Sequence, residues 1–267
     1  MRMNSFLSRL LVDVCLIRFG IQKNTVSRIG LFIVMLSSVI FITLQYYLWK
    51  SVYKYNSVQY MSFGETFSYI VFAQCIYCIY PSSTSNIIGE LMKNGNISLY
   101  MVKPISIFRR FIFEQIGTSI YKFIFLALPT LAIAWLFFGV SVGRPDMLII
   151  LAILIFSYLF YFTFEMIIGC LSFITKSIWG IQSLKFTVLL LLTGRIIPLD
   201  FYPTSIQKVI TKLPFRFFFA SLADSISRNV SFSIYDFLEL TATVILSIII
   251  YIVIFSLACR HFTVQGG

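Results

Sequence analysis

The sequence predicts an all-α, polytopic membrane protein. Of its 267 residues, 59% are hydrophobic and only 12% are charged, which leaves too little polar surface to cover a soluble domain of this length. Several apolar stretches approach twenty residues, and a helix of that length crosses a hydrocarbon layer of roughly 30 Å. We therefore expect six membrane spans, with an amphipathic helix before them and short outer helices between spans five and six.

Residues 1–28 are expected to form an amphipathic helix that lies in the membrane interface. Apolar residues recur at helical spacing from Leu7 to Ile21, whereas Arg9, Asp13 and Arg18 lie elsewhere around the helix. The alternative is a helix that faces water and packs on a partner. The same three charges interrupt any apolar run, so the segment does not have the pattern of a cleavable signal peptide.

The six predicted spans cover residues 29–49, 63–81, 118–138, 147–169, 178–192 and 237–258. Pro129 removes one backbone hydrogen bond inside the third span and predicts a kink there. Residues 82–117 form a polar connection, in which the sequence KNGN at 93–96 indicates a turn. Basic residues gather before the first span and in this connection, which predicts that both termini lie in the cytoplasm.

The stretch at 194–228 interrupts the membrane region with Pro198, Pro203 and Pro214. Apolar residues return at helical spacing after Pro203 and again after Pro214, and proline is well tolerated in a first helical turn. Neither piece is long enough to span a bilayer. Residues 200–228 are therefore predicted to form two amphipathic helices, re-entrant or interfacial, on the extracellular side.

Two charges lie inside predicted spans, Glu165 in the fourth and Lys185 in the fifth. If these spans form a hairpin centred near Thr175, the two charges lie at similar depth. Isolated charges in hydrocarbon are costly, so we expect them to face each other or a polar cavity. The alternative is that each side chain reaches the lipid headgroups separately.

The remaining composition argues against other classes of protein. The net charge of +11 comes from scattered basic residues, which does not indicate nucleic-acid binding. Cys75 and Cys78 form a CxxC without a second pair, which is more typical of helix packing than of a zinc or redox site. The chain has no phosphate-binding glycine loop, no HExxH and no GxSxG, and its one histidine is His261. It is predicted to be no enzyme and to hold no metal or cofactor.

Two motifs carry a resemblance to a known family. LYMVKPIS at 99–106 and GRIIPLDFYPTSIQKVITKLPF at 194–215 occur in the order found in bacterial ABC-2 type permeases. With six spans and an N-terminal helix, the chain resembles the uncharacterised export permeases of this family over essentially its whole length. The resemblance implies that residues 1–28 are the elbow helix and that residues 29–267 are the transmembrane domain of a bacterial cytoplasmic membrane protein.

The resemblance also implies partners and site residues. A coupling helix would contact an ATPase subunit through Ile88, Gly89, Glu90, Leu91, Met92 and Lys93. Lys103 and Pro104 match the Lys-Pro of the family and would return the chain to the third span. Two ATPase subunits would bind ATP and Mg, a second permease subunit would complete a homodimer or heterodimer, and the outer helices would cover the exit path.

The predicted function is therefore export of a hydrophobic or amphipathic substrate, driven by ATP hydrolysis in a separate subunit. The alternative is a secondary carrier or channel without an ATPase, which favours an array of intramembrane charges. A membrane-embedded enzyme would need clustered His, Asp or Glu at one membrane face, and a purely structural membrane protein stays open. The substrate itself cannot be read from the sequence.

Overall fold

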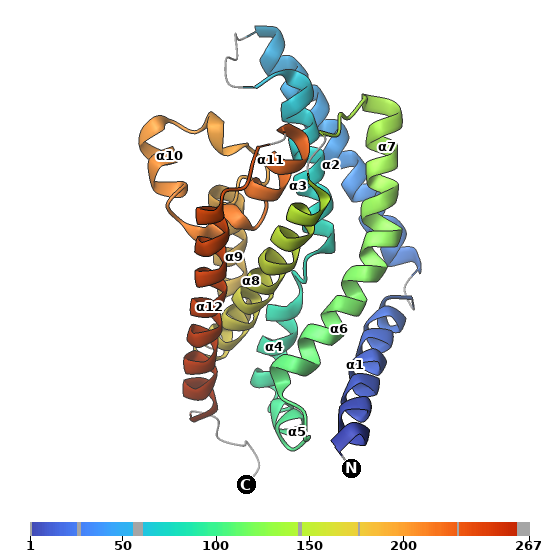
Figure 1. Cartoon of the computed structure of the whole chain (residues 1–267), viewed down its shortest axis with the longest axis vertical. Coiled ribbons are helices and arrows are strands. Elements are labelled where there is room, and N and C mark those ends of the chain that lie inside the picture. Colours follow the sequence, from blue (N-terminus) through green and yellow to red (C-terminus); the bar gives the residue numbers. More distant parts are fainter. Residues whose placement is uncertain are drawn as a thin grey trace.

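The computed structural model is an assembly of helices that run mostly along one direction (Figure 1). One end of the molecule holds the N-terminus, α4 (Thr84–Lys93), α5 (Ile97–Met101) and the end of α12 (Ile234–Arg260). α10 (Thr204–Ile210) lies toward the opposite end. The structure describes residues 2–25, 28–55, 61–143, 146–175, 177–228 and 230–260. Within these ranges every regular element is a helix, so the all-α prediction is confirmed.

Four helices in the described ranges are long and apolar enough to cross a membrane: Ile29–Tyr55, Ile107–Phe138, Met147–Leu171 and Ile234–Cys259. Two further predicted spans are shorter, α3 (Phe63–Ile79) with 17 residues and α9 (Ile178–Leu192) with 15. The protein is therefore a multi-pass helical bundle by length and composition. The count of six spans stays a prediction.

α3 is short because it is enclosed by protein. Ser62 and Glu65 form a reciprocal capping box that fixes its start, and the helix ends two residues before Pro81. Twelve of its 17 residues are buried. It packs against α2 (Arg28–Tyr55) and against α11 (Ala220–Arg228) of the outer segment, which comprises residues 194–228. Its surroundings are therefore mostly side chains of the same chain.

The third predicted span starts earlier than expected. We predicted a start at Thr118, but α6 (Ile107–Lys122) begins eleven residues before that position. Ser106 caps the helix by accepting a hydrogen bond from the backbone N–H of Arg109. The polar residues that suggested a loop are helical because α1 (Arg2–Thr25) packs along α6 and neutralises their charges.

The contact between α1 and α6 depends on ion pairs and on two glycines. Arg109 donates two hydrogen bonds to Asp13, at 2.9 and 2.7 Å, and Lys23 Nζ lies 3.1 Å from a carboxylate oxygen of Glu114. A Cβ at Gly20 or at Gly117 would come within 2.0 Å of a backbone oxygen of the other helix. The backbones therefore meet without side chains between them.

The N-terminal part of the predicted apolar face of α1 is exposed, whereas Ile17 lies against α6. Leu7, Leu11 and Val14 are 53, 64 and 61% exposed, whereas Asp13 is buried. The face is available to lipid or to a partner, so the interfacial placement stays a prediction.

Pro129 is accommodated by an irregular turn. A π-helix, η1 (Phe123–Ala127), directly precedes α7 (Leu128–Phe138), and the N–H of Leu128 donates to the carbonyl of Phe123, five residues back. Proline cannot donate to the regular helical ladder, and a local π adjustment is one way to satisfy the neighbouring groups. The disturbance predicted at this proline takes the form of a π turn.

Each of the three outer prolines begins a short helical element. Pro198 stands directly before η2 (Leu199–Phe201), Pro203 stands before α10, and Pro214 is the first residue of η3 (Pro214–Phe217). α11 (Ala220–Arg228) follows η3 after a break. The sequence predicted one continuous helix after Pro214, and the structure divides it into a 3-10 turn and an α-helix.

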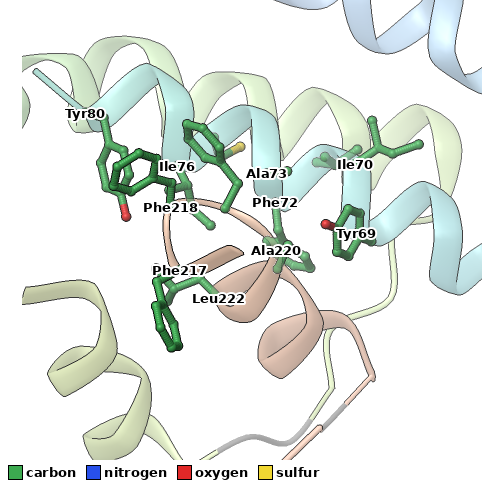
Figure 2. Close-up of a cluster of buried hydrophobic side chains, with 14 of the residues drawn as sticks. Tyr69, Ile70, Phe72, Ala73, Ile76, Tyr80, Phe217, Phe218, Ala220 and Leu222 are labelled. Atoms are coloured by element: carbon green, nitrogen blue, oxygen red, sulfur yellow. The ribbon is translucent and has the colours of Figure 1, made fainter. Parts of the chain in front are cut away.

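The second outer piece packs into the protein core, and its predicted place relative to the membrane stays a prediction. Phe217, Phe218 and Phe219 are fully buried, and α11 packs against α3 (Figure 2). Ring centroids of Phe218 and Phe219 lie 5.0 Å from Tyr161 and 5.4 Å from Tyr80, respectively. Helical periodicity cannot detect this arrangement, because the end of η3 and the two-residue turn after it bring three consecutive side chains into the core. Within α10, by contrast, Ile206 and Val209 are 49 and 61% exposed.

Candidate functional site

α4 lies against α8 (Met147–Ile174) at the end of the bundle where α1 begins and α12 ends (Figure 1). Ile88 and Met92 are almost fully buried. A Cβ at Gly169 would lie 2.7 Å from the Cβ of Ile88, so this glycine allows the two helices to approach closely. Gly89 is also buried.

The six residues predicted to contact an ATPase therefore divide into two groups. Glu90 and Lys93 are exposed and Leu91 is half-buried. Ile88, Gly89 and Met92 pack within the chain itself, and the contact of the six residues with an ATPase stays a prediction. An amphipathic helix with one face on the bundle has only its other face free for a partner.

The N-terminal turn of α4 is joined to two membrane helices by a buried ion pair. Lys185 Nζ on α9 lies 2.9 Å from Glu165 Oε1 on α8. Glu165 is fully buried and Lys185 is 7% exposed. The structure thus brings together the two charges predicted to lie at similar depth, and neither side chain reaches outward separately.

Ser85 of α4 completes this network. Its backbone N–H and its hydroxyl donate to Glu165 Oε2, at 3.0 and 2.6 Å. The ammonium of Lys185 donates to Ser85 Oγ at 2.9 Å and to the carbonyl of Ser82 at 3.2 Å. All three donors of the ammonium are therefore used. Two opposite charges held in a dry setting by further hydrogen bonds make α4, α8 and α9 one polar unit.

An exposed apolar surface adjoins α4 at the same end of the chain. Leu99, Met101 and Val102, in and just after α5, are 63, 50 and 86% exposed. Lys103 and Pro104 follow and are also exposed, immediately before α6. Sequence reasoning missed the three apolar residues, although an apolar run directly after the KNGN turn was a signal.

Two charge clusters organise the outer segment. Arg228 forms ion pairs with Asp224 and, at 2.7 Å, with Asp200. Burial raises the pKa of Asp224 to about 6; the nearby negative charge of Asp200 adds to this shift and Arg228 opposes it. Arg216 pairs with Asp236 and Glu239 of α12, at 2.9 and 2.7 Å. These contacts hold the outer segment to the bundle.

Sequence reasoning also missed polar residues in the interior. Lys122 lies in the third span, halfway along the apolar helix Ile107–Phe138, and Arg195 lies three residues after the end of α9. A single lysine or arginine hardly changes a hydropathy window of eighteen residues, so only its position inside an apolar run could have marked it.

Metal and thiol chemistry has no geometric support in the described residues. No three His, Cys, Asp or Glu side chains there could hold a metal ion together. Cys75 and Cys78 are buried free thiols, and Cys78 Sγ lies 3.7 Å from Ser38 Oγ. His261 lies outside the described residues.

Comparison with known families gives one match. The model of the family described as ABC-2 family transporter protein matches residues 32–266. Curated proteins give no match to the sequence.

Proposed function

Because the chain belongs to the ABC-2 transporter family, we propose that it is the membrane-spanning subunit of an ABC exporter. It would form the export path for a hydrophobic or amphipathic substrate, with ATP and Mg bound by a separate ATPase. The family match and the apolar helices establish a multi-pass membrane transport subunit. Export direction and the ATPase coupling are inferred.

The link from α4 to α8 and α9 is the observation that carries the proposal. A helix that receives force from an ATPase must be attached to the helices that move. Ser85 attaches α4 to both through Glu165 and Lys185, while Glu90 and Lys93 face outward. Movement of α4 would therefore displace both membrane helices, because separating them exposes an unpaired buried charge.

The proposed docking surface combines the exposed face of α4 with the apolar residues after it. It comprises Glu90, Lys93, Leu99, Met101 and Val102. Exposed apolar residues rimmed by charges are typical of a protein interface.

Several finer features belong to the same proposal. The complete transporter would have two ATPase subunits and a second permease subunit, and each permease would have six spans with both termini in the cytoplasm. α1 would be the elbow helix at the inner membrane surface. α4, α5 and both ends of the described chain lie at one end of the bundle (Figure 1), which supports this topology.

Copurification tests the proposal. The chain would be expressed with candidate ATPase subunits from its own genome, and the wild type compared with Glu90→Ala/Lys93→Ala. We expect one ATPase to copurify, and the double variant to lower its recovery and ATP-driven transport about tenfold, since it removes two charged contacts. Lys208→Ala/Lys212→Ala removes two exposed charges at the opposite end and should match the wild type. Transport without any copurifying ATPase would refute the proposal and favour a secondary carrier.

A further inference from the structure

Two adjoining cavities lie inside the bundle, beside the network of Lys185. Their volumes are about 190 and 460 Å³. The two cavities share three lining residues, Tyr77, Ser82 and Arg195, so each of these residues borders both spaces. Lys185 lines the smaller cavity and Lys122 lines the larger one.

The cavities are lined by cations without any carboxylate. Lys122, Lys185 and Arg195 line them, and no Asp or Glu is among the lining residues. Lys185 is neutralised by Glu165. Lys122 has no ion pair or hydrogen bond to any described side chain, and Arg195 has no ion pair to one. Among the described residues, two of these positive charges therefore have no carboxylate paired with them, and a charge without a partner is costly away from water.

Arg195 is held in place by neutral groups. Its Nη2 donates to Gln74 Oε1 at 3.0 Å, and its guanidinium carbon lies 3.3 Å from the ring centroid of Tyr77. An aromatic face stabilises a cation without neutralising it. Its Nε is buried and has no hydrogen-bond partner in the described part of the chain, so one donor of the guanidinium is unused.

Further unsatisfied polar groups belong to residues that line the smaller cavity. The hydroxyl of Tyr161 and Nε2 of Gln182 are buried without a partner among the described residues. Tyr161 is fully buried. Native proteins leave few buried polar atoms unsatisfied, and each such atom calls for a ligand, a water or a function.

The rest of the lining is mixed. Phe186, Leu189 and Leu190 line the smaller cavity, and Val34 and Leu126 line the larger one, which Ser37, Ser38 and Gln74 also line. The apolar part of this surface accepts a hydrocarbon chain.

We propose that these cavities bind an anionic amphiphile, whose acidic group pairs with Arg195 and Lys122 while its apolar tail lies along the aliphatic lining. The acid would be a phosphate or a carboxylate. Arginine offers a planar pair of donors to either group and lysine offers a point charge. This inference rests on the proposed function, because it names the chemical class of the substrate for that export path.

The test measures binding to the full-length chain alone, in nanodiscs of zwitterionic phosphatidylcholine. Radiolabelled dodecyl phosphate would be titrated by equilibrium dialysis, with dodecyltrimethylammonium as the probe of opposite charge and inorganic phosphate as the probe without a tail. Saturable binding of dodecyl phosphate at least about tenfold tighter than either control is expected. Equal binding of the ammonium probe would overturn the charge assignment, and equal binding of inorganic phosphate would overturn the role of the tail.

Lys122→Gln is the decisive variant, because Lys122 has no hydrogen bond whose loss could unfold the protein. It should weaken dodecyl phosphate binding about tenfold, since it removes one charged contact. Arg195→Gln should do the same where it folds. Lys208→Gln removes an exposed lysine of α10 and should leave binding unchanged. Unchanged binding in Lys122→Gln would refute the proposed site.

Competition identifies the natural source of the acidic group. Adding phosphatidylglycerol to the nanodiscs should displace dodecyl phosphate if the site takes a lipid headgroup, and should leave it bound if the site takes only single-tailed cargo. Both outcomes presuppose that the cavities bind an acidic group, and they differ only in its source. The measurement uses no ATPase, so failure to copurify an ATPase refutes the proposed transporter role and leaves this binding result standing.

Discussion

Removing one partner of the Glu165–Lys185 pair should strongly destabilise the protein. In Glu165→Gln the ammonium of Lys185 stays buried without a carboxylate, because its side chain is only 9% exposed. Breaking a buried ion pair in this way costs about 3–5 kcal/mol. For a chain of this size about 1 kcal/mol corresponds to roughly 2–4 °C, so the midpoint of thermal unfolding should fall by about 10 °C.

The double variant Glu165→Gln/Lys185→Met is the matched control. It removes both charges, keeps similar volumes, and should recover most of the loss, to within about 1 kcal/mol of the wild type. The charge swap Glu165→Lys/Lys185→Glu should recover less. Its new lysine would face the backbone N–H of Ser85, which now donates to Glu165, and two donors cannot bond each other.

The assay is thermal unfolding of the purified chain in one detergent, followed by intrinsic tryptophan fluorescence. A midpoint for Glu165→Gln within about 3 °C of the wild type would refute the reasoning, since roughly 1 kcal/mol is too little for a broken buried pair. A double variant no more stable than the single variant would also show that the two residues do not interact.

Three further predictions use the same unfolding assay. Gly20→Ala should destabilise the chain by about 1–3 kcal/mol, because the new Cβ would lie 2.0 Å from a backbone oxygen of α6; Gly64→Ala, which meets no atom within 4 Å, should not. Phe218→Ala should cost about 3–5 kcal/mol by leaving a cavity in the core, whereas Phe137→Ala, 76% exposed, should cost far less. Burial raises the pKa of Asp224 to about 6 from an ordinary value near 4, so the folded chain binds the extra proton in this range. The contribution of Asp224 to the free energy of unfolding should therefore fall as the pH rises from about 4 to 6, and the difference in stability between the wild type and Asp224→Asn should change by that amount across this range.

The sequence predicts features that depend on local periodicity, and it predicts which residues of two helices meet when both lie at equal distances along the chain from the turn that joins them. The bounds predicted for the fifth span, 178–192, are those of α9. Glu165 and Lys185 each lie ten residues from Thr175, so an antiparallel hairpin brings them to the same level. The cost of an isolated charge supplies the reason for them to meet.

Features that depend on a partner helix could not be predicted in this way. The start of α6 carries Arg109 and Glu114, which look like loop residues until α1 supplies Asp13 and Lys23. The role of Ser85 could not be predicted either, because nothing in the local sequence indicates that its backbone N–H lies beside the carboxylate of Glu165, eighty residues later. Tertiary contact decides both cases, and helical periodicity carries no information about it.

Lys185 connects the two proposals and gives a last prediction. The same ammonium lines the smaller cavity and donates to Ser82 and Ser85 at the start of α4. An acidic ligand in that cavity would compete with Glu165 for this ammonium and weaken the attachment of α4. If the ligand changes the affinity of α4 for the ATPase by some factor, the bound ATPase must change the affinity of the cavity for the ligand by that same factor, because coupling between two binding sites is reciprocal. Dodecyl phosphate affinity should therefore shift about tenfold when the ATPase is bound, and Glu165→Gln/Lys185→Met, which removes both buried charges together, should abolish the shift. If dodecyl phosphate binds with the same affinity with and without the ATPase, the cavity is not coupled to the docking surface on α4.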